Sequence, residues 1–95
     1  MAVLRLDHFT IDPADTGEML TRHAALAAAA KDAFPGLIEV QLAKVDDQTW
    51  LDVWRWDSLA SAQAAVAGAP AIPQAGAAFS LTKSITVEYA EVVDA

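Results

Sequence analysis

Two histidines are the side chains of this sequence best suited to move a proton. His23 falls on the apolar stripe of a predicted helix, and His8 lies on the first predicted strand, with Leu4 and Leu6 on its face. An imidazole titrates near neutral pH, so either residue could act as a general base. Each could instead be a hydrogen-bonded core histidine, or, for His23, a residue at a dimer edge. His23 and His8 are therefore the candidate catalytic residues, with a packing role as the alternative.

A metal ion or a covalent nucleophile finds little support in the sequence. The two histidines form neither an HxH nor an HxxxH spacing, so we expect no metal site. There is no cysteine, which excludes thiolate catalysis and disulfides. The serines at positions 58, 61 and 80 have no histidine nearby in the sequence, so a hydrolase triad is not indicated. We also expect no bound cofactor.

Asp7 and Asp52 are the strand carboxylates that we expect to be partly buried. A desolvated carboxylate has a raised pKa and can serve as a base. The alternative, which we favour, is an ion pair with Arg5 or Arg55.

Three tryptophans recur at spacings of two and four residues along one predicted strand. Trp50, Trp54 and Trp56 therefore share a face of the sheet. They could stack a planar ligand, or they could be packing or dimer-interface residues, since each aromatic side chain buries about 150–250 Å². The candidate substrate-pocket residues are Trp54, Trp56, Phe79 and Met19.

The elements that must position these residues follow from the pattern of apolar residues and breakers. We expect strands at 3–11, 37–45, 49–56 and 81–92, and helices at about 13–33 and 58–67. Asp12-Pro13 is typical of a helix start, and Pro35-Gly36 and Gly68-Ala69-Pro70 of helix ends. Residues 71–80, rich in Ala, Gly and Pro, could hold one short helical turn.

This order predicts an α+β domain of the ferredoxin-like βαββαβ plan. Such a domain has a four-stranded antiparallel sheet with two helices on one face. The alanines of both helices could let the helices approach the sheet closely, or could leave a cavity opposite the tryptophans.

The loop of the central hairpin decides which side chains face the helices. With a two-residue loop at Asp46-Asp47, Leu51 and Val53 would lie on the face that suits helix packing, and the tryptophans on the other. With a three-residue loop the partners swap, because a slip of one residue flips a strand. Either register puts apolar side chains on both faces, which predicts a homodimer.

Length and charge set the remaining bounds. Ninety-five residues make a single domain, 1–95, and the hydrophobic content of 55% is high. The net charge is −7 and no two basic residues are adjacent, so neither nucleic acid nor an anionic membrane surface is an expected partner. No apolar run approaches the roughly 18–20 residues of a membrane span, and no signal-peptide core is visible. A cytoplasmic location is expected.

The segment Asp52-Val53-Trp54-Arg55-Trp56-Asp57-Ser58, followed by an Ala-rich helix, resembles the antibiotic biosynthesis monooxygenase-like family. The Asp-Pro helix start and the total length are similar too. The resemblance implies a homodimeric α/β barrel in which two sheets face each other. It also implies a pocket between the helices and the sheet of each protomer. Some members oxidise polycyclic aromatic compounds with oxygen and no bound metal or flavin, and others degrade haem. The implied function is a cofactor-free monooxygenase acting on a small, planar aromatic or apolar molecule.

The sequence departs from the family in its second helix, where Ala64, Ala65 and Val66 stand near the position of a common histidine. Trp54 also replaces an acidic residue. The Ala-rich run further lacks the Trp and His of the haem degraders, so haem degradation is not expected. These departures favour the alternative, a non-catalytic homodimer that binds a small ligand or is purely structural. A closed, packed core would exclude both the enzyme and the ligand binder, whereas an open pocket holding a histidine with a displaced pKa would support the enzyme.

Overall fold

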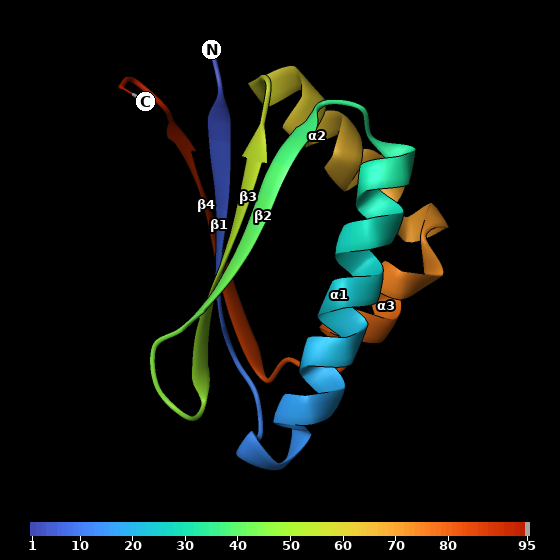
Figure 1. Ribbon diagram of the computed structural model, residues 1–95, viewed down its shortest axis with the longest axis vertical. Coiled ribbons are helices and arrows are strands. Elements are labelled where there is room, and N and C mark those ends of the chain that lie inside the picture. The colour runs from blue at the N-terminus through green and yellow to red at the C-terminus, as the bar shows by residue number, and fades with distance from the viewer. Residues whose placement is uncertain (95) are drawn as a thin grey trace.

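The computed structural model describes residues 1–94 and contains one four-stranded antiparallel sheet with every helix on the same side (Figure 1). The strands run in the order β2-β3-β1-β4, with bounds β1 Val3–Thr10, β2 Leu37–Lys44, β3 Thr49–Trp56 and β4 Ser84–Glu91. The helices are α1 Thr16–Ala33, α2 Leu59–Gly68 and α3 Pro73–Phe79, with single 3₁₀ turns η1 Pro13–Asp15 and η2 Ala69–Ala71. The predicted ferredoxin-like plan is confirmed. No helix among the described residues is long and apolar enough to span a membrane.

The first helix starts with a tighter turn than the sequence suggested. The Asp12 carboxylate accepts a hydrogen bond from the Ala14 backbone N–H at 3.0 Å and caps η1, and α1 follows from Thr16. Pro13 occupies the first position of η1, where its missing N–H costs nothing.

The segment after α2 contains more helix than one short turn. η2 is followed by α3, with Pro73 at its first position. The Thr82 hydroxyl and backbone N–H both donate to the Phe79 carbonyl, at 2.8 and 3.0 Å, and this turn delays the start of β4 to Ser84. The helical layer, which was predicted to have two helices, thus contains a third helix, α3, packed beside α1 (Figure 1).

The pairing of the central hairpin continues one residue past β2, to Val45 opposite Thr49, and leaves a loop of three residues, Asp46 to Gln48. Lys44 pairs with Trp50, and the Val45 N–H donates to the Thr49 carbonyl at 2.9 Å. The Asp46 carboxylate closes the loop by accepting from the N–H groups of Gln48 and Thr49, at 2.9 and 2.7 Å. These bonds favour the carboxylate and lower the pKa of Asp46. The two-residue register is therefore wrong, and the three-residue alternative holds.

This register turns the tryptophans towards the helices. Two apolar clusters form under the helices: Leu26, Ala30, Trp54, Trp56, Ala62, Ala65 and Ala75 in one, and Phe9, Ile11, Met19 and Trp50 in the other. The opposite side of the sheet, which we call the helix-free face, carries Leu4, Leu6, Leu51 and Val53 at its centre. These four side chains are only partly buried, so apolar surface remains accessible on the side of the sheet away from the helices.

Candidate active site

A cavity of about 510 Å³ lies between the helices and the sheet. Its size falls in the range of roughly 300–1,000 Å³ typical of small-molecule sites. All four candidate pocket residues line it, namely Met19, Trp54, Trp56 and Phe79. Short side chains of α2 and α3, including Ala62, Ala65 and Ala75, form the opposite wall, so the alanines leave space rather than closing the core. Phe79 and Ile85 are both lining and exposed, which marks one place where the cavity meets solvent.

Two tryptophans with nearly parallel rings form the aromatic wall of the cavity. The rings of Trp54 and Trp56 stack with centroids 6.4 Å apart and planes 11° from parallel. Phe34 braces Trp56 edge-on at 6.1 Å. The Trp56 Nε1–H is buried and finds no acceptor among residues 1–94, an arrangement that costs about 1–3 kcal/mol. Trp50 shares the face but lies in the other cluster and does not line the cavity.

His23 reaches the cavity from α1 and is held by a carboxylate on β3. Its Nε2 lies 2.9 Å from Asp52 Oδ1, although 29 residues separate the two in sequence. The imidazole side chain is 14% exposed, and its ring meets Trp54 edge-on at 6.1 Å. An acceptor on Nε2 fixes the ring tautomer and leaves Nδ1 as the nitrogen with the free lone pair. The pair thus has the geometry that a general base and its orienting group need.

A second buried carboxylate stands directly beside the first. Asp7 on β1 is the cross-strand partner of Asp52, and the two residues are 3% and 6% exposed. Asp7 Oδ1 accepts a hydrogen bond from Arg5 Nε at 2.9 Å, as the ion-pair alternative anticipated. Burial raises the pKa of Asp7, and the hydrogen bond and charge of Arg5 only partly oppose this. Arg5, Asp7, His23 and Asp52 together make the polar part of an otherwise apolar cavity.

His8 lies elsewhere. It is exposed, it alternates with Asp7 and Phe9 along β1, and it is not among the cavity-lining residues. Of the two candidate bases, the fold brings only His23 to the cavity. Among residues 1–94, no three His, Asp or Glu side chains are arranged to hold a metal ion.

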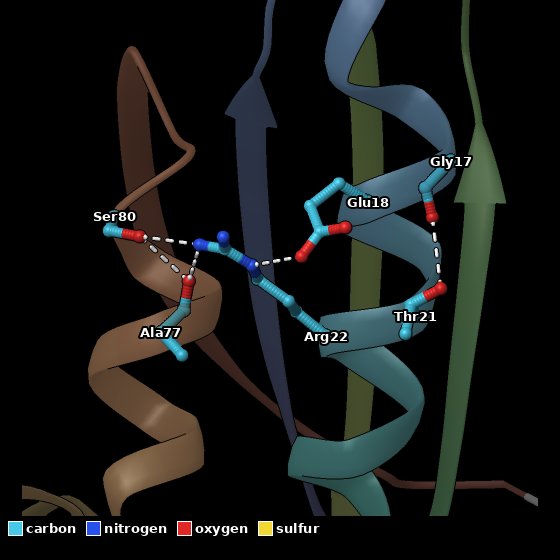
Figure 2. Close-up of polar contacts among 6 residues, drawn as sticks. All are labelled: Gly17, Glu18, Thr21, Arg22, Ala77 and Ser80. Atoms are coloured by element: carbon cyan, nitrogen blue, oxygen red, sulfur yellow. Dashed lines mark hydrogen bonds and ion pairs between the residues drawn. The ribbon is translucent and has the colours of Figure 1, made fainter.

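Arg22 ties the cavity-covering helix α3 to α1 (Figure 2). Its Nη1 donates to the Ala77 carbonyl at 2.9 Å and to Ser80 Oγ at 3.0 Å, while its Nε donates to Glu18 at 2.8 Å. α3 buries only Ala75, so these bonds complement a small apolar contact. Arg22 therefore helps to hold the Ala-rich wall over the cavity.

Sequence reasoning missed two roles. It did not pair His23 with Asp52, because nothing local links a helix residue to a strand residue so far along the chain. It also did not place Arg5 in the cavity. The alternation of Asp52 with Trp50 and Trp54 was the one available signal, since a carboxylate between two buried aromatics must itself face the core.

Neither a protein-family model nor a curated protein matches the sequence. Solved structures do match. A Caulobacter crescentus protein assigned to the antibiotic biosynthesis monooxygenases superimposes with a TM-score of 0.82 at 20% identity, covering 98% of this chain and 91% of that one. SnoaB, a cofactor-independent oxygenase from Streptomyces nogalater, gives 0.74 at 20% identity, with 99% and 95% covered. This chain has the antibiotic biosynthesis monooxygenase fold.

The same fold includes proteins of different activity. MhuD, a haem degrader from Mycobacterium tuberculosis whose structure holds two haems in its active site, superimposes with a TM-score of 0.74 at 24% identity, covering 98% of this chain and 97% of that one. The antibiotic biosynthesis monooxygenase fold thus accommodates both oxygenase and haem chemistry. The side chains in the cavity, rather than the fold, must carry an argument about activity.

Proposed function

We propose that this protein is a cofactor-free monooxygenase that acts on a small, planar aromatic molecule. The observation that carries the proposal is the His23–Asp52 pair on the wall of an apolar, tryptophan-lined cavity. A flat ligand would lie against the Trp54–Trp56 wall, beside the histidine. The oxygenase SnoaB offers an analogy of fold for this activity.

The reaction needs only positioning, a base and exclusion of water. His23 takes a proton from an acidic CH₂ group of the substrate, leaving a carbanion and an imidazolium. The carbanion supplies the electrons that reduce dioxygen and forms a C–O–O⁻ peroxide, which takes the proton back from His23. Loss of water from the hydroperoxide then gives a ketone, so one oxygen atom enters the product and the other leaves as water. Asp52 stabilises the imidazolium while the proton is held.

Dimerisation is part of this proposal. The helix-free face carries the partly exposed side chains of Leu4, Leu6, Leu51 and Val53, and a second copy of the chain would bury them. Facing sheets of two copies would close a barrel and leave one cavity in each protomer, outside the interface.

Oxygen uptake with anthrone tests the activity, because anthrone is a planar tricyclic ketone with an acidic CH₂ group. The wild-type protein should consume oxygen and form anthraquinone, and His23→Ala should lose about 10²–10⁴-fold in rate, the usual contribution of a general base. His8→Ala is the matched control, because that histidine lies outside the cavity and should leave the rate unchanged. Equal rates for the wild type and His23→Ala would exclude His23 as the base.

The second candidate function is a non-catalytic binder of the same class of ligand. The α2 side of the cavity favours it, because α2 contributes only Ala62, Ala65 and Val66 to the lining and no polar side chain. Tight binding of anthraquinone with no oxygen uptake from anthrone would select this alternative.

A further inference from the structure

Arg5 places a guanidinium inside the cavity with most of its donors unused. Its side chain is 20% exposed and lines the cavity from β1. Its Nε donates to Asp7 Oδ1 at 2.9 Å, and the Tyr89 side chain also interacts with the guanidinium. A guanidinium has five N–H donors, so those of its terminal amino groups that Tyr89 does not take remain for something that enters the cavity.

The guanidinium is fixed in position and in charge. Burial acts to lower the pKa of Arg5, but its hydrogen bond and ion pair with Asp7 outweigh this, and the pKa is raised on balance. The Tyr89 side chain, across from Arg5 on β4, also favours the charged form. Asp7 is thus a positioning residue that holds Arg5 through one nitrogen and leaves its other side open.

Arg5 and His23 are both neighbours of Trp54. The cross-strand partner of Arg5 on β3 is Trp54, and the ring of Trp54 meets the ring of His23. A planar molecule stacked on the tryptophan wall would therefore have the histidine and the guanidinium on the same polar side of the cavity. A base and a cationic donor held on one wall suit a ligand that loses a proton and gains charge on an oxygen.

We infer that Arg5 binds the ligand oxygen that becomes negative when His23 takes the proton, so that the cavity selects phenols and enolisable ketones over carboxylates. This inference rests on the proposed function and names the group that its substrate must carry. When the proton moves, the ligand becomes an enolate or phenolate and His23 an imidazolium, so the total charge of the site does not change.

The other charged groups of the wall disfavour a ligand that is already an anion. Asp7 and Asp52 are both buried there, and only Arg5 carries a permanent positive charge against them. The lining residues of α2 and α3 carry no charge, and Tyr89 faces the site from β4. A carboxylate would enter a site with an excess negative charge as long as His23 is neutral, whereas a phenol enters uncharged.

Three naphthalenes substituted at the same ring carbon test this: naphthol, methoxynaphthalene and naphthoate. Bound naphthol should ionise about one pH unit or more below free naphthol, as seen in the long-wavelength absorbance of naphtholate. Arg5→Met should abolish this shift and weaken naphtholate binding about tenfold or more, with methoxynaphthalene binding changed less than about twofold. Naphthoate should bind the wild type about tenfold more weakly than naphthol.

Two further variants keep the test independent of folding. Arg5→Met leaves Asp7 buried and unpaired, so the double variant Arg5→Met/Asp7→Asn removes both charges and should bind methoxynaphthalene while still failing to shift naphthol. Arg55→Met, an arginine on β3 that does not line the cavity, should behave as the wild type.

The outcomes separate this inference from the proposed function. If methoxynaphthalene binds but the ionisation of naphthol is the same with and without Arg5, the cavity stands as an aromatic site and the role of Arg5 is wrong. Arg5-dependent binding of naphthoate that is tighter than that of naphthol would likewise overturn the selectivity. If none of the three probes binds, the proposed function and this inference both fall.

Discussion

Asp7 and Asp52 are direct cross-strand partners on the cavity wall, and each is bound to a different basic group. Asp7 pairs with Arg5 from its own strand, and Asp52 pairs with His23 from α1. Two adjacent buried carboxylates repel each other, and these basic partners offset part of that repulsion. The result is a wall with a guanidinium on one side and an imidazole on the other. That division of roles is what the proposed reaction requires.

Replacing Asp52 with Asn should impair the base without removing it. The amide keeps the size of the side chain but cannot stabilise an imidazolium as a carboxylate does. We expect kcat for anthrone oxidation to fall at least about tenfold, with KM changed less than about twofold. Circular dichroism of both proteins controls for folding. A rise in KM with unchanged kcat would show that Asp52 serves ligand binding instead.

Replacing Asp7 with Asn should change how stability depends on pH. The pKa of Asp7 is raised from 3.8 by burial, so the native state binds this proton more tightly than the unfolded state does. The resulting stabilisation is complete below pH 3.8 and is lost as pH rises through the raised pKa. Asn cannot ionise, so the unfolding free energy of the variant minus that of the wild type should increase with pH across this window and then level off. Urea unfolding at a series of pH values measures it, and a difference that falls with pH would contradict the assignment.

The tryptophans should report ligand binding unequally. Trp54 lines the cavity, whereas Trp50 does not, although it packs in one cluster with Phe9, Ile11 and Met19. Anthraquinone, a planar quencher, should therefore quench the wild type and Trp50→Phe to a similar extent. Trp54→Phe should lose much of that change. Fluorescence titration of the three proteins checks this, and the opposite ranking would move the ligand to the second cluster.

Two glycine substitutions should have opposite effects on stability. A Cβ on Gly76, in the middle of α3, would meet nothing within 4 Å, so Gly76→Ala should stabilise the helix by up to about 1 kcal/mol. A Cβ on Gly36 would come within 2.5 Å of Ser61 Oγ and 2.9 Å of Asp57 Oδ1, so Gly36→Ala should destabilise by about 1–3 kcal/mol. Thermal unfolding of both variants measures this. A destabilised Gly76→Ala would mean that α3 packs more closely than described.

A charge on the helix-free face should break the proposed dimer. The wild type should sediment at twice 10.0 kDa, and Val53→Lys near 10.0 kDa, because a lysine would be buried at the centre of the interface. Leu20→Lys is the control, since Leu20 is exposed on α1, on the far side of the molecule from that face. A wild-type species of 10.0 kDa in dilute buffer would contradict dimerisation.

Much of the scaffold could be predicted because its signals are local. Alternation along 49–56 is strong enough to give the bounds of β3 and the shared face of its tryptophans. The apolar spacing of Met19, His23 and Leu26 likewise placed His23 on the inward side of α1. Residues 71–80 gave a weaker signal, since Ala, Gly and Pro show little periodicity. The helix α3 found there is longer than the single helical turn that was expected.

The parts that could not be predicted depend on contacts between distant segments. The face that the tryptophans cover goes with the register of the central hairpin, whose loop contains two hydrogen bonds to the Asp46 side chain that the sequence alone does not reveal. Whether the alanines close the core or leave a cavity depends on how far the helices stand from the sheet, which a sequence does not contain. The pairing of His23 with Asp52 follows from the same geometry.

The most direct test of the His23 base is deuterium exchange into the CH₂ group of anthrone, followed by NMR in D₂O without oxygen. This measures proton removal alone, before any reaction with dioxygen. The wild type should accelerate the exchange about 10²–10⁴-fold over buffer, and His23→Ala should not. Exchange at the buffer rate in the presence of wild-type protein, with anthrone bound, would contradict the central claim.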